Sequence, residues 1–170
     1  MHWMVPLHNL DEYQLEVLGR CGRLLGNSQW IQGFAGSGKS VLLVHIAQTL
    51  LADDPGLSIC ITSFTHALKD LLKTGFAEQI LGSITVITHT NFLSGNKKGK
   101  YDVVAVDEIQ DIPRGDIQKI KGRTKHMVVA GDNDQSIFEG STVEEIKEVL
   151  NPEIFRLETI YRLTQNIKEI

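Results

Sequence analysis

Short apolar runs alternate with amphipathic stretches along nearly the whole chain. Six apolar runs predict strands, at residues 28–32, 57–64, 84–88, 101–107, 126–132 and 154–157. Several of them are continuously apolar instead of alternating with polar positions, which is typical of parallel strands covered by helices on both faces. The pattern therefore predicts an α/β fold with an open parallel β-sheet flanked by helices, where ligands bind at the carboxyl ends of the strands.

The pattern also predicts four helices, one before the first strand and three between the strands, at about residues 10–25, 39–51, 66–76 and 143–150. Residues 39–51 are apolar on nearly all sides, so we expect this helix to be deeply packed. The last helix has Ser141 or Thr142 available as its N-cap, and Pro152 follows its end. No internal repeat or low-complexity tract appears, and the stretch "SGNKKGK", 94–100, is the one conspicuous loop that we expect to be flexible.

A glycine-rich segment, "GFAGSGKS", follows the first predicted strand and matches the pattern G-x-x-x-x-G-K-[ST]. In such a loop the glycines let successive backbone N–H groups point at phosphate oxygens, and the following helix adds its N-terminal partial charge. Lys39 is expected to reach the β- and γ-phosphates, and the Ser40 hydroxyl to bind Mg²⁺. A mere glycine-rich turn is the alternative, but the strand–loop–helix context favours nucleotide binding. The predicted nucleotide-binding residues of this loop are Gly33, Gly36, Ser37, Gly38, Lys39 and Ser40.

The segment "VVAVDEIQD", 103–111, places three acids at the end of an apolar strand. Acids side by side repel one another, so a bound cation or chemistry on a substrate accounts for them better than stability does. In nucleotide hydrolases with a phosphate-binding loop, Mg²⁺ is held by the loop hydroxyl and by an acid that ends a neighbouring strand. We expect Asp107 to be that acid and Glu108 to polarise the attacking water as a general base. For this segment taken alone, an exposed acidic turn is the alternative.

The composition and net charge of the chain exclude several classes of protein. The chain has 170 residues, 17 of them basic and 21 acidic, and the net charge of −4 excludes the strongly basic footprint of a histone-like nucleic-acid binder. No apolar run approaches the length of a membrane span and the N-terminus lacks a signal-peptide pattern, so we expect a cytoplasmic protein without membrane contact. Cys21 and Cys60 are expected to be reduced thiols, and the six histidines lack zinc-binding spacing.

Further segments occur in a fixed order along nearly the whole chain. They are "LDEYQ" (10–14), "TSFTHALKDLL" (62–72), "THTNF" (88–92), "VDEIQD" (106–111), "VVAGDNDQSIF" (128–138) and "LETIYRLTQNI" (157–167). Together with the phosphate-binding loop, they resemble the Q motif and motifs Ia to IV of superfamily 1 helicases of the UvrD/Rep/PcrA type. The resemblance implies a RecA-like P-loop NTPase domain that uses ATP and Mg²⁺ and acts as a helicase motor.

The resemblance also implies roles for residues around the nucleotide. Gln14 would hold the adenine edge, because a side-chain amide donates and accepts at once, and Tyr161 would stack on the adenine. Gln135 would sense the γ-phosphate, and Arg162 would reach its charge. Gln110 would couple the nucleotide state to the nucleic-acid side of the domain; a solvated polar position after a strand is the alternative for Gln110.

Residues at two other strand ends are implied to face single-stranded nucleic acid. They are Phe64, Thr65, His66 and Thr88, and Phe64 would stack on a base. For Phe64, a plain core position is the alternative. We expect single-stranded DNA, possibly RNA, as the partner, bound weakly by this chain alone.

The chain departs from the family pattern at several places. Only residues 93–100 stand where relatives carry a helical accessory subdomain, and Glu139, Gly140 and Ser141 replace the aromatic and arginines usual after motif III. Ile160 and Leu163 replace the asparagine and serine that flank the tyrosine–arginine pair of motif IV. Motifs V and VI do not occur before Ile170.

The departures shape the predicted domain organisation. We expect residues 1–156 to form the motor domain without a large insertion, and residues 157–170 to form the motif IV segment and the start of a linker to a second motor domain. The fragment is expected to be a monomer. Two alternatives stay open, a stand-alone nucleotide-binding regulatory module that does not translocate and another P-loop enzyme such as a small-molecule kinase.

Overall fold

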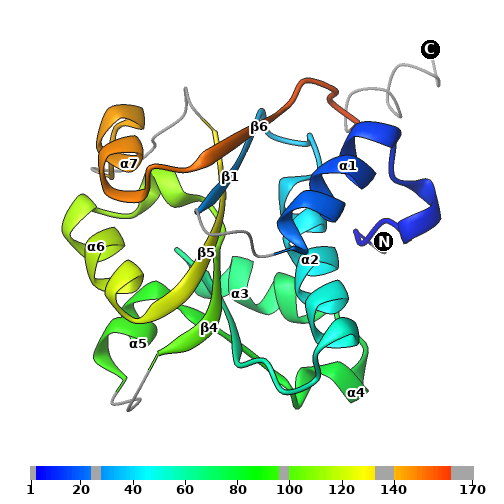
Figure 1. Cartoon of the computed structure of the whole chain (residues 1–170), viewed down its shortest axis with the longest axis horizontal. Coiled ribbons are helices and arrows are strands. Elements are labelled where there is room, and N and C mark those ends of the chain that lie inside the picture. Colours follow the sequence, from blue (N-terminus) through cyan, green and yellow to red (C-terminus); the bar gives the residue numbers. More distant parts are fainter. Residues whose placement is uncertain (1–2, 24–27, 96–99, 133–139, 162–170) are drawn as a thin grey trace.

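A six-stranded parallel β-sheet forms the centre of the molecule in the computed structural model, which describes residues 3–23, 28–95, 100–132 and 140–161 (Figure 1). The strands lie in the order β3-β2-β4-β5-β1-β6. Their bounds are β1 Gln29–Gly33, β2 Ile59–Ser63, β3 Ile84–Thr88, β4 Tyr101–Val106, β5 Thr124–Gly131 and β6 Glu153–Leu157. All strand pairs are parallel, and all six predicted strands are confirmed.

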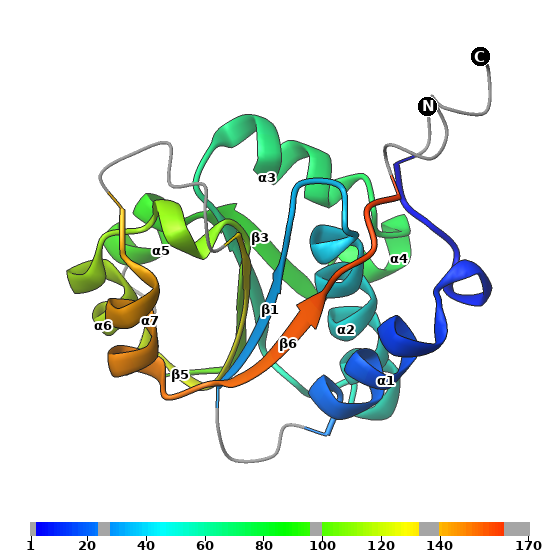
Figure 2. The ribbon, with the colours of Figure 1, turned by 90° about the horizontal axis from the view of Figure 1, so that it is seen from above.

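Helices cover both faces of the sheet, as Figure 2 shows from above. The helical elements are η1 Leu7–Asn9, α1 Glu12–Cys21, α2 Lys39–Asp53, α3 His66–Lys73, α4 Glu78–Leu81, α5 His89–Ser94, η2 Ile109–Asp111, α6 Arg114–Gly122 and α7 Val143–Leu150. Helices α1, α2 and α3 pack on one face, in a core that includes Ile31, Ile61 and Ala105. Helices α5, α6 and α7 pack on the other face, against Trp30 and Val104. The two faces use alternate residues of the same strands, which explains the continuous apolar runs.

Two predicted helix boundaries were wrong in detail, and the structure decides between the two candidate caps of α7. Helix α1 begins at Glu12 and not near residue 10, because Asp11 is its N-cap and forms a capping box with Gln14. Helix α3 ends at Lys73, three residues before the predicted end. Of the two candidate caps of α7, Thr142 is the N-cap, whereas Ser141 is buried and donates its hydroxyl to the backbone oxygen of Ile112 at 2.6 Å.

The two cysteines, Cys21 and Cys60, are free and buried, as expected. Burial, with a smaller effect of Glu153, raises the pKa of the Cys21 thiol to about 12. Within the part of the chain that the structure describes, no helix is long and apolar enough to cross a membrane.

The strand order decides which loops meet. Because all strands are parallel, their carboxyl ends lie on one edge of the sheet, and the loops after β4 and β1 are separated there only by the end of β5. The chain after β6 lies on the other side of β1. The ends of β2 and β3 lie beyond β4, away from β1. This edge therefore carries the phosphate-binding loop in the middle and the other candidate residues on both sides of it.

Candidate functional site

The glycine-rich loop joins β1 to α2 with backbone that only glycine adopts readily. Gly36 and Gly38 have φ angles of 84° and 92°, in the left-handed region, and Gly38 is the N-cap of α2. A Cβ on Gly38 would also lie 2.7 Å from the Gln14 amide nitrogen. The loop thus needs its glycines for conformation and for the close approach of α1.

The Lys39 ammonium lies over this loop. It is 6% exposed and donates to the backbone oxygens of Gly33, at 2.7 Å, and Phe34, at 3.0 Å. A buried lysine at the first position of α2 places a positive charge beside the backbone N–H groups of the loop. Both features attract phosphate oxygens.

Ser40 and Asp107 come together across the carboxyl edge of the sheet. The Ser40 hydroxyl donates to Asp107 Oδ2 at 2.7 Å, and the Asp107 side chain is completely buried just after β4. Burial raises the pKa of Asp107 to about 6, and the neighbouring Glu108 charge adds to this, while Ser40 and Lys39 oppose it. A hydroxyl and a carboxylate oxygen in contact form the hard-oxygen donor set that Mg²⁺ prefers. The pair therefore fits the predicted Mg²⁺ ligands.

Glu108 has an unusual backbone conformation. Its φ and ψ are both 53°, in the left-handed region, which costs a non-glycine residue on the order of 1–2 kcal/mol. Its N–H donates to Asp107 Oδ1 at 3.1 Å, and its carboxylate accepts from the Gln110 amide at 2.7 Å. Strain of this kind is found at functional sites, and here it turns the Glu108 side chain toward Gln110.

Gln110 connects two strand ends. It is 6% exposed; its Nε2 donates to Glu108 Oε2, and its Oε1 accepts from the Asp132 N–H at 3.2 Å. The alternative of a solvated polar position is therefore wrong. Asp132 follows β5 and belongs to the motif III segment, so Gln110 links the predicted base to that segment. The coupling role itself remains a prediction.

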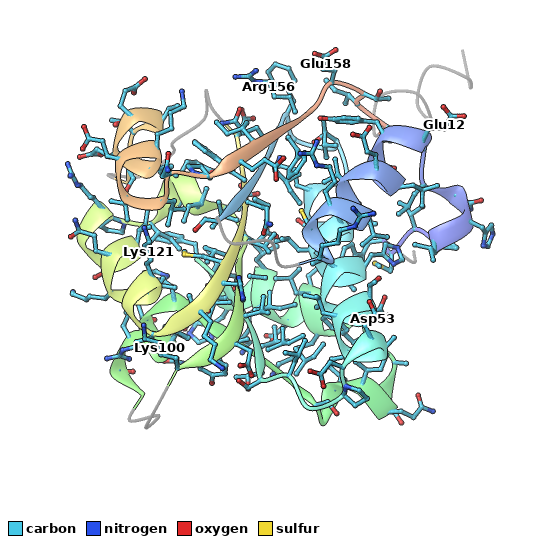
Figure 3. The ribbon with its side chains drawn as sticks, viewed as in Figure 1. Glu12, Asp53, Lys100, Lys121, Arg156 and Glu158 are labelled. Carbon is cyan, nitrogen blue, oxygen red and sulfur yellow. The ribbon has the colours of Figure 1, made fainter. Side chains whose placement is uncertain are left out.

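A cavity of about 510 Å³ lies between the start of α1 and the chain after β6. Among the residues that line this α1–β6 cavity are Asp11, Tyr13, Gln14, Ser37, Leu157 and Tyr161. Figure 3 shows Arg156 and Glu158 on the β6 side of this region and Glu12, the first residue of α1, on the other. The cavity adjoins the phosphate-binding loop through Ser37, where a base attached to a bound triphosphate would be expected.

Gln14 and Tyr161, the two predicted adenine-binding residues, both line the α1–β6 cavity. Gln14 is 4% exposed; its Oε1 accepts from the Asp11 N–H at 3.1 Å, and its Nε2 donates to the Ser37 backbone oxygen at 3.4 Å. The Tyr161 N–H donates to the Gly36 oxygen at 3.1 Å. The buried amide on the apolar face of α1 is thus explained by contacts with the loop, because buried polar groups need partners.

The predicted nucleic-acid residues lie at the ends of β2 and β3. The Phe64 ring is half-buried and stacks on the His89 ring, with centroids 5.3 Å apart and planes 7° from parallel. Burial lowers the pKa of His89, and the Asp116 charge opposes this shift. The Phe64 ring therefore packs against the core with partial exposure, and its stacking on a base remains a prediction.

Thr65, His66 and Thr88 differ in exposure. Thr65 and His66 are exposed at the start of α3, where Thr65 is the N-cap. Thr88 is only 1% exposed and caps α5 by accepting from the Asn91 N–H at 3.3 Å. Its hydroxyl therefore has a structural role, and its exposed neighbours Thr90 and Asn91 are better placed for an external ligand.

Two predicted residues, Gln135 and Arg162, lie outside the described residues. The remaining predicted nucleotide-binding residues gather along the carboxyl ends of β4, β1 and β6.

Comparisons with known proteins agree on the class of fold and family. A family model described as the viral superfamily 1 RNA helicase core domain matches residues 29–167. DNA helicase II of Escherichia coli (strain K12) is 34% identical over 101 residues, an alignment that covers 54% of this chain and 14% of that protein. The chain therefore spans a small part of this relative.

Solved structures share the fold. The Pif1 helicase from Candida albicans matches with a TM-score of 0.63 and 21% identity, over 97% of this chain and 42% of that one. A Bacteroides Pif1 bound to ssDNA matches with a TM-score of 0.56 and 16% identity, over 90% of this chain and 42% of that one. At these identities the likeness concerns the fold alone.

Proposed function

Because the chain belongs to the superfamily 1 helicases, in the family described as the viral superfamily 1 RNA helicase core domain, we propose that it is an ATP-binding motor domain. In the full-length protein this domain couples ATP hydrolysis to movement along single-stranded nucleic acid. Residues 1–156 form the motor domain, and residues 157–170 lead toward a second motor domain of the same chain. The 14% coverage of DNA helicase II supports this organisation.

The observation that carries the proposal is the 2.7 Å hydrogen bond between Ser40 and Asp107, with the buried Lys39 ammonium beside it. Ser40 and Asp107 would hold Mg²⁺, which neutralises phosphate charge when bound. Lys39 and the loop N–H groups would bind the β- and γ-phosphates. The base would enter the α1–β6 cavity, beside Gln14 and Tyr161.

Hydrolysis would depend on Glu108. A general base must lie within reach of the water that it activates, and Glu108 follows the Mg²⁺ ligand directly while its carboxylate is oriented by Gln110. The same Gln110 contacts the residue after β5. This supports a role in reporting the nucleotide state to the rest of the motor, together with Gln135 and Arg162.

The nucleic acid would contact the ends of β2 and β3. Phe64 offers a partly exposed ring, and Thr65 and His66 lie exposed beside it. We favour single-stranded DNA over RNA because the relative from Escherichia coli is named as a DNA helicase. The family model, in contrast, is described as an RNA helicase core domain. Binding by this chain alone is weak, since its net charge is −4.

Titration calorimetry with Mg-ATP tests the nucleotide site. The wild-type chain and a Lys119→Ala control, whose lysine is exposed on α6, bind Mg-ATP equally. Lys39→Ala loses most of this affinity, because the ammonium beside the loop carbonyls is removed. Equal affinity of the wild type and Lys39→Ala would contradict the assignment of the loop.

A further inference from the structure

The Asp11 carboxylate has two partners that are far apart in the sequence. Its Oδ1 accepts from the Gln14 N–H at 2.7 Å, which is the N-cap bond of α1. Its Oδ2 accepts from the hydroxyl of Tyr161. The cap needs only one oxygen, so the contact with Tyr161 is additional to the capping box. Asp11, Gln14 and Tyr161 all line the α1–β6 cavity.

Tyr161 is held at both of its ends. Its N–H donates to the Gly36 oxygen of the phosphate-binding loop at 3.1 Å, and its hydroxyl donates to Asp11. The ring between these two points is 37% exposed. Burial and the Asp11 hydrogen bond raise the pKa of Tyr161 to about 12, so its hydroxyl is a protonated donor at neutral pH.

A second hydrogen bond joins the same two sides of the cavity, and its donor again comes from the β6 side. The Tyr13 hydroxyl, from α1, accepts from the Arg156 N–H of β6 at 3.3 Å. Each side of the α1–β6 cavity therefore contributes a tyrosine that is bonded to the other side. These two contacts join the sides of the cavity, and Asp11 supplies the charged one.

We propose that Asp11 is a positioning residue for the nucleotide base, because its second carboxylate oxygen holds the Tyr161 ring beside the α1–β6 cavity before the nucleotide binds. This inference rests on the proposed nucleotide-binding function and adds a residue to it. A ring that is already ordered loses less conformational freedom when a base packs against it, so affinity is higher. Asp11 acts through Tyr161 and does not itself need to contact the base.

The variant Asp11→Ser separates the two functions of this carboxylate. Serine is as good an N-cap as aspartate and preserves the capping-box pattern with Gln14. Its side chain has one oxygen, so the bond to Tyr161 is lost while the cap stays. Tyr161→Phe removes the same bond from the other side, keeps the ring and leaves α1 untouched. Tyr101→Phe, on β4 and outside the cavity-lining residues, is the matched control.

Calorimetry with two probes, Mg-ATP and Mg-tripolyphosphate, distinguishes base positioning from general damage. We expect Asp11→Ser and Tyr161→Phe each to lose about three- to tenfold in Mg-ATP affinity, as expected when one side chain must be ordered on binding. Their affinity for tripolyphosphate, which has no base, stays that of the wild type. The double variant binds Mg-ATP no more weakly than either single variant, because both changes remove one interaction.

Three outcomes would overturn the inference. One is wild-type Mg-ATP affinity in Tyr161→Phe, a second is an equal loss for both probes in Asp11→Ser, and a third is additive losses in the double variant. Thermal unfolding of each variant identifies a folding defect, and Tyr161→Phe decides the question if Asp11→Ser does not fold. A wild-type chain that binds neither probe would instead contradict the proposed function.

Discussion

Ser40 donates its hydroxyl to Asp107 over a sequence separation of 67 residues, at 2.7 Å. Ser40 lies at the start of α2, after β1, and Asp107 follows β4. The strand between them, β5, ends in Gly131. The bond therefore depends on the order of the strands, and it brings the two predicted Mg²⁺ ligands together on protein contacts alone.

The buried Asp107 carboxylate is expected to lower the stability of the chain at neutral pH. Its folded-state pKa of about 6 lies above the ordinary value of 3.8, so protonation favours the folded state. The stabilisation is complete below about pH 4 and is lost as the pH rises through about 6. The shift corresponds to roughly 3 kcal/mol of unfolding free energy.

Asp107→Asn tests this pH dependence, because asparagine stays neutral and still accepts from Ser40. In urea unfolding with a chelator present, we expect the variant to exceed the wild type by about 1–3 kcal/mol at pH 7.5, and by almost nothing at pH 4. Asp53→Asn, at an exposed position at the end of α2, is the control and shows no such trend. A difference that does not vary with pH would contradict the burial effect.

Glu108→Gln is expected to slow ATP hydrolysis without weakening ATP binding. The amide cannot take a proton from water, and loss of a general base costs about 10²- to 10⁴-fold in rate. A single-turnover ATPase assay and Mg-ATP calorimetry measure the two effects on the same sample. Glu144→Gln, exposed on α7, should behave as the wild type. Unchanged ATP turnover in Glu108→Gln would show that Glu108 is not the general base.

Phe64→Ala is expected to weaken binding of single-stranded oligonucleotides. An aromatic–base stack contributes about 1–3 kcal/mol, or roughly 5- to 150-fold in affinity. A fluorescence titration with oligo-dT and oligo-U at two salt concentrations measures the loss, and binding should weaken as salt rises.

Phe34→Ala is the control for this titration, because its ring is 48% exposed on the phosphate-binding loop instead of the β2 end. It should bind oligonucleotides like the wild type when no nucleotide is present. Nanomolar binding by the wild-type chain at physiological salt would show that the expectation of weak binding is wrong. Equal losses in both variants would show that the effect is not specific to the end of β2.

Gly131→Ala is expected to destabilise the chain. A Cβ at this position would meet the Gln110 side-chain oxygen and lie 2.8 Å from Ile109 Cγ2. Such overpacking costs about 1–3 kcal/mol. Gly19→Ala, in the exposed part of α1 with no atom within 4 Å of the added Cβ, should stabilise by roughly 0.5–1 kcal/mol. Urea unfolding measures the free energy of unfolding of the two variants. An unchanged free energy of unfolding in Gly131→Ala would show that the Gln110 side chain can move away from the added Cβ without destabilising the fold.

The secondary-structure elements and the phosphate-binding loop of this protein could be predicted from the sequence. Six strands and the phosphate-binding loop depend on neighbouring residues, such as the continuous apolar runs and the glycines before Lys39. Ser40 and Asp107 were also predicted to bind one Mg²⁺ ion, because nucleotide hydrolases with a phosphate-binding loop hold the metal with the loop hydroxyl and an acid at the end of a neighbouring strand. The ordered motifs further indicated the superfamily 1 helicase family, which the family match confirms.

Other features depended on which elements the fold places side by side. The bond between Asp11 and Tyr161 joins residues 150 positions apart, and no local pattern at either residue indicates it. The burial of Thr88 and the bond from Gln110 to Glu108 likewise follow from packing around α5 and η2. Apolar periodicity determines which elements form, because it acts over one helical turn or two strand residues. The partners of buried polar groups are decided only when the sheet order and the helix packing bring distant segments into contact.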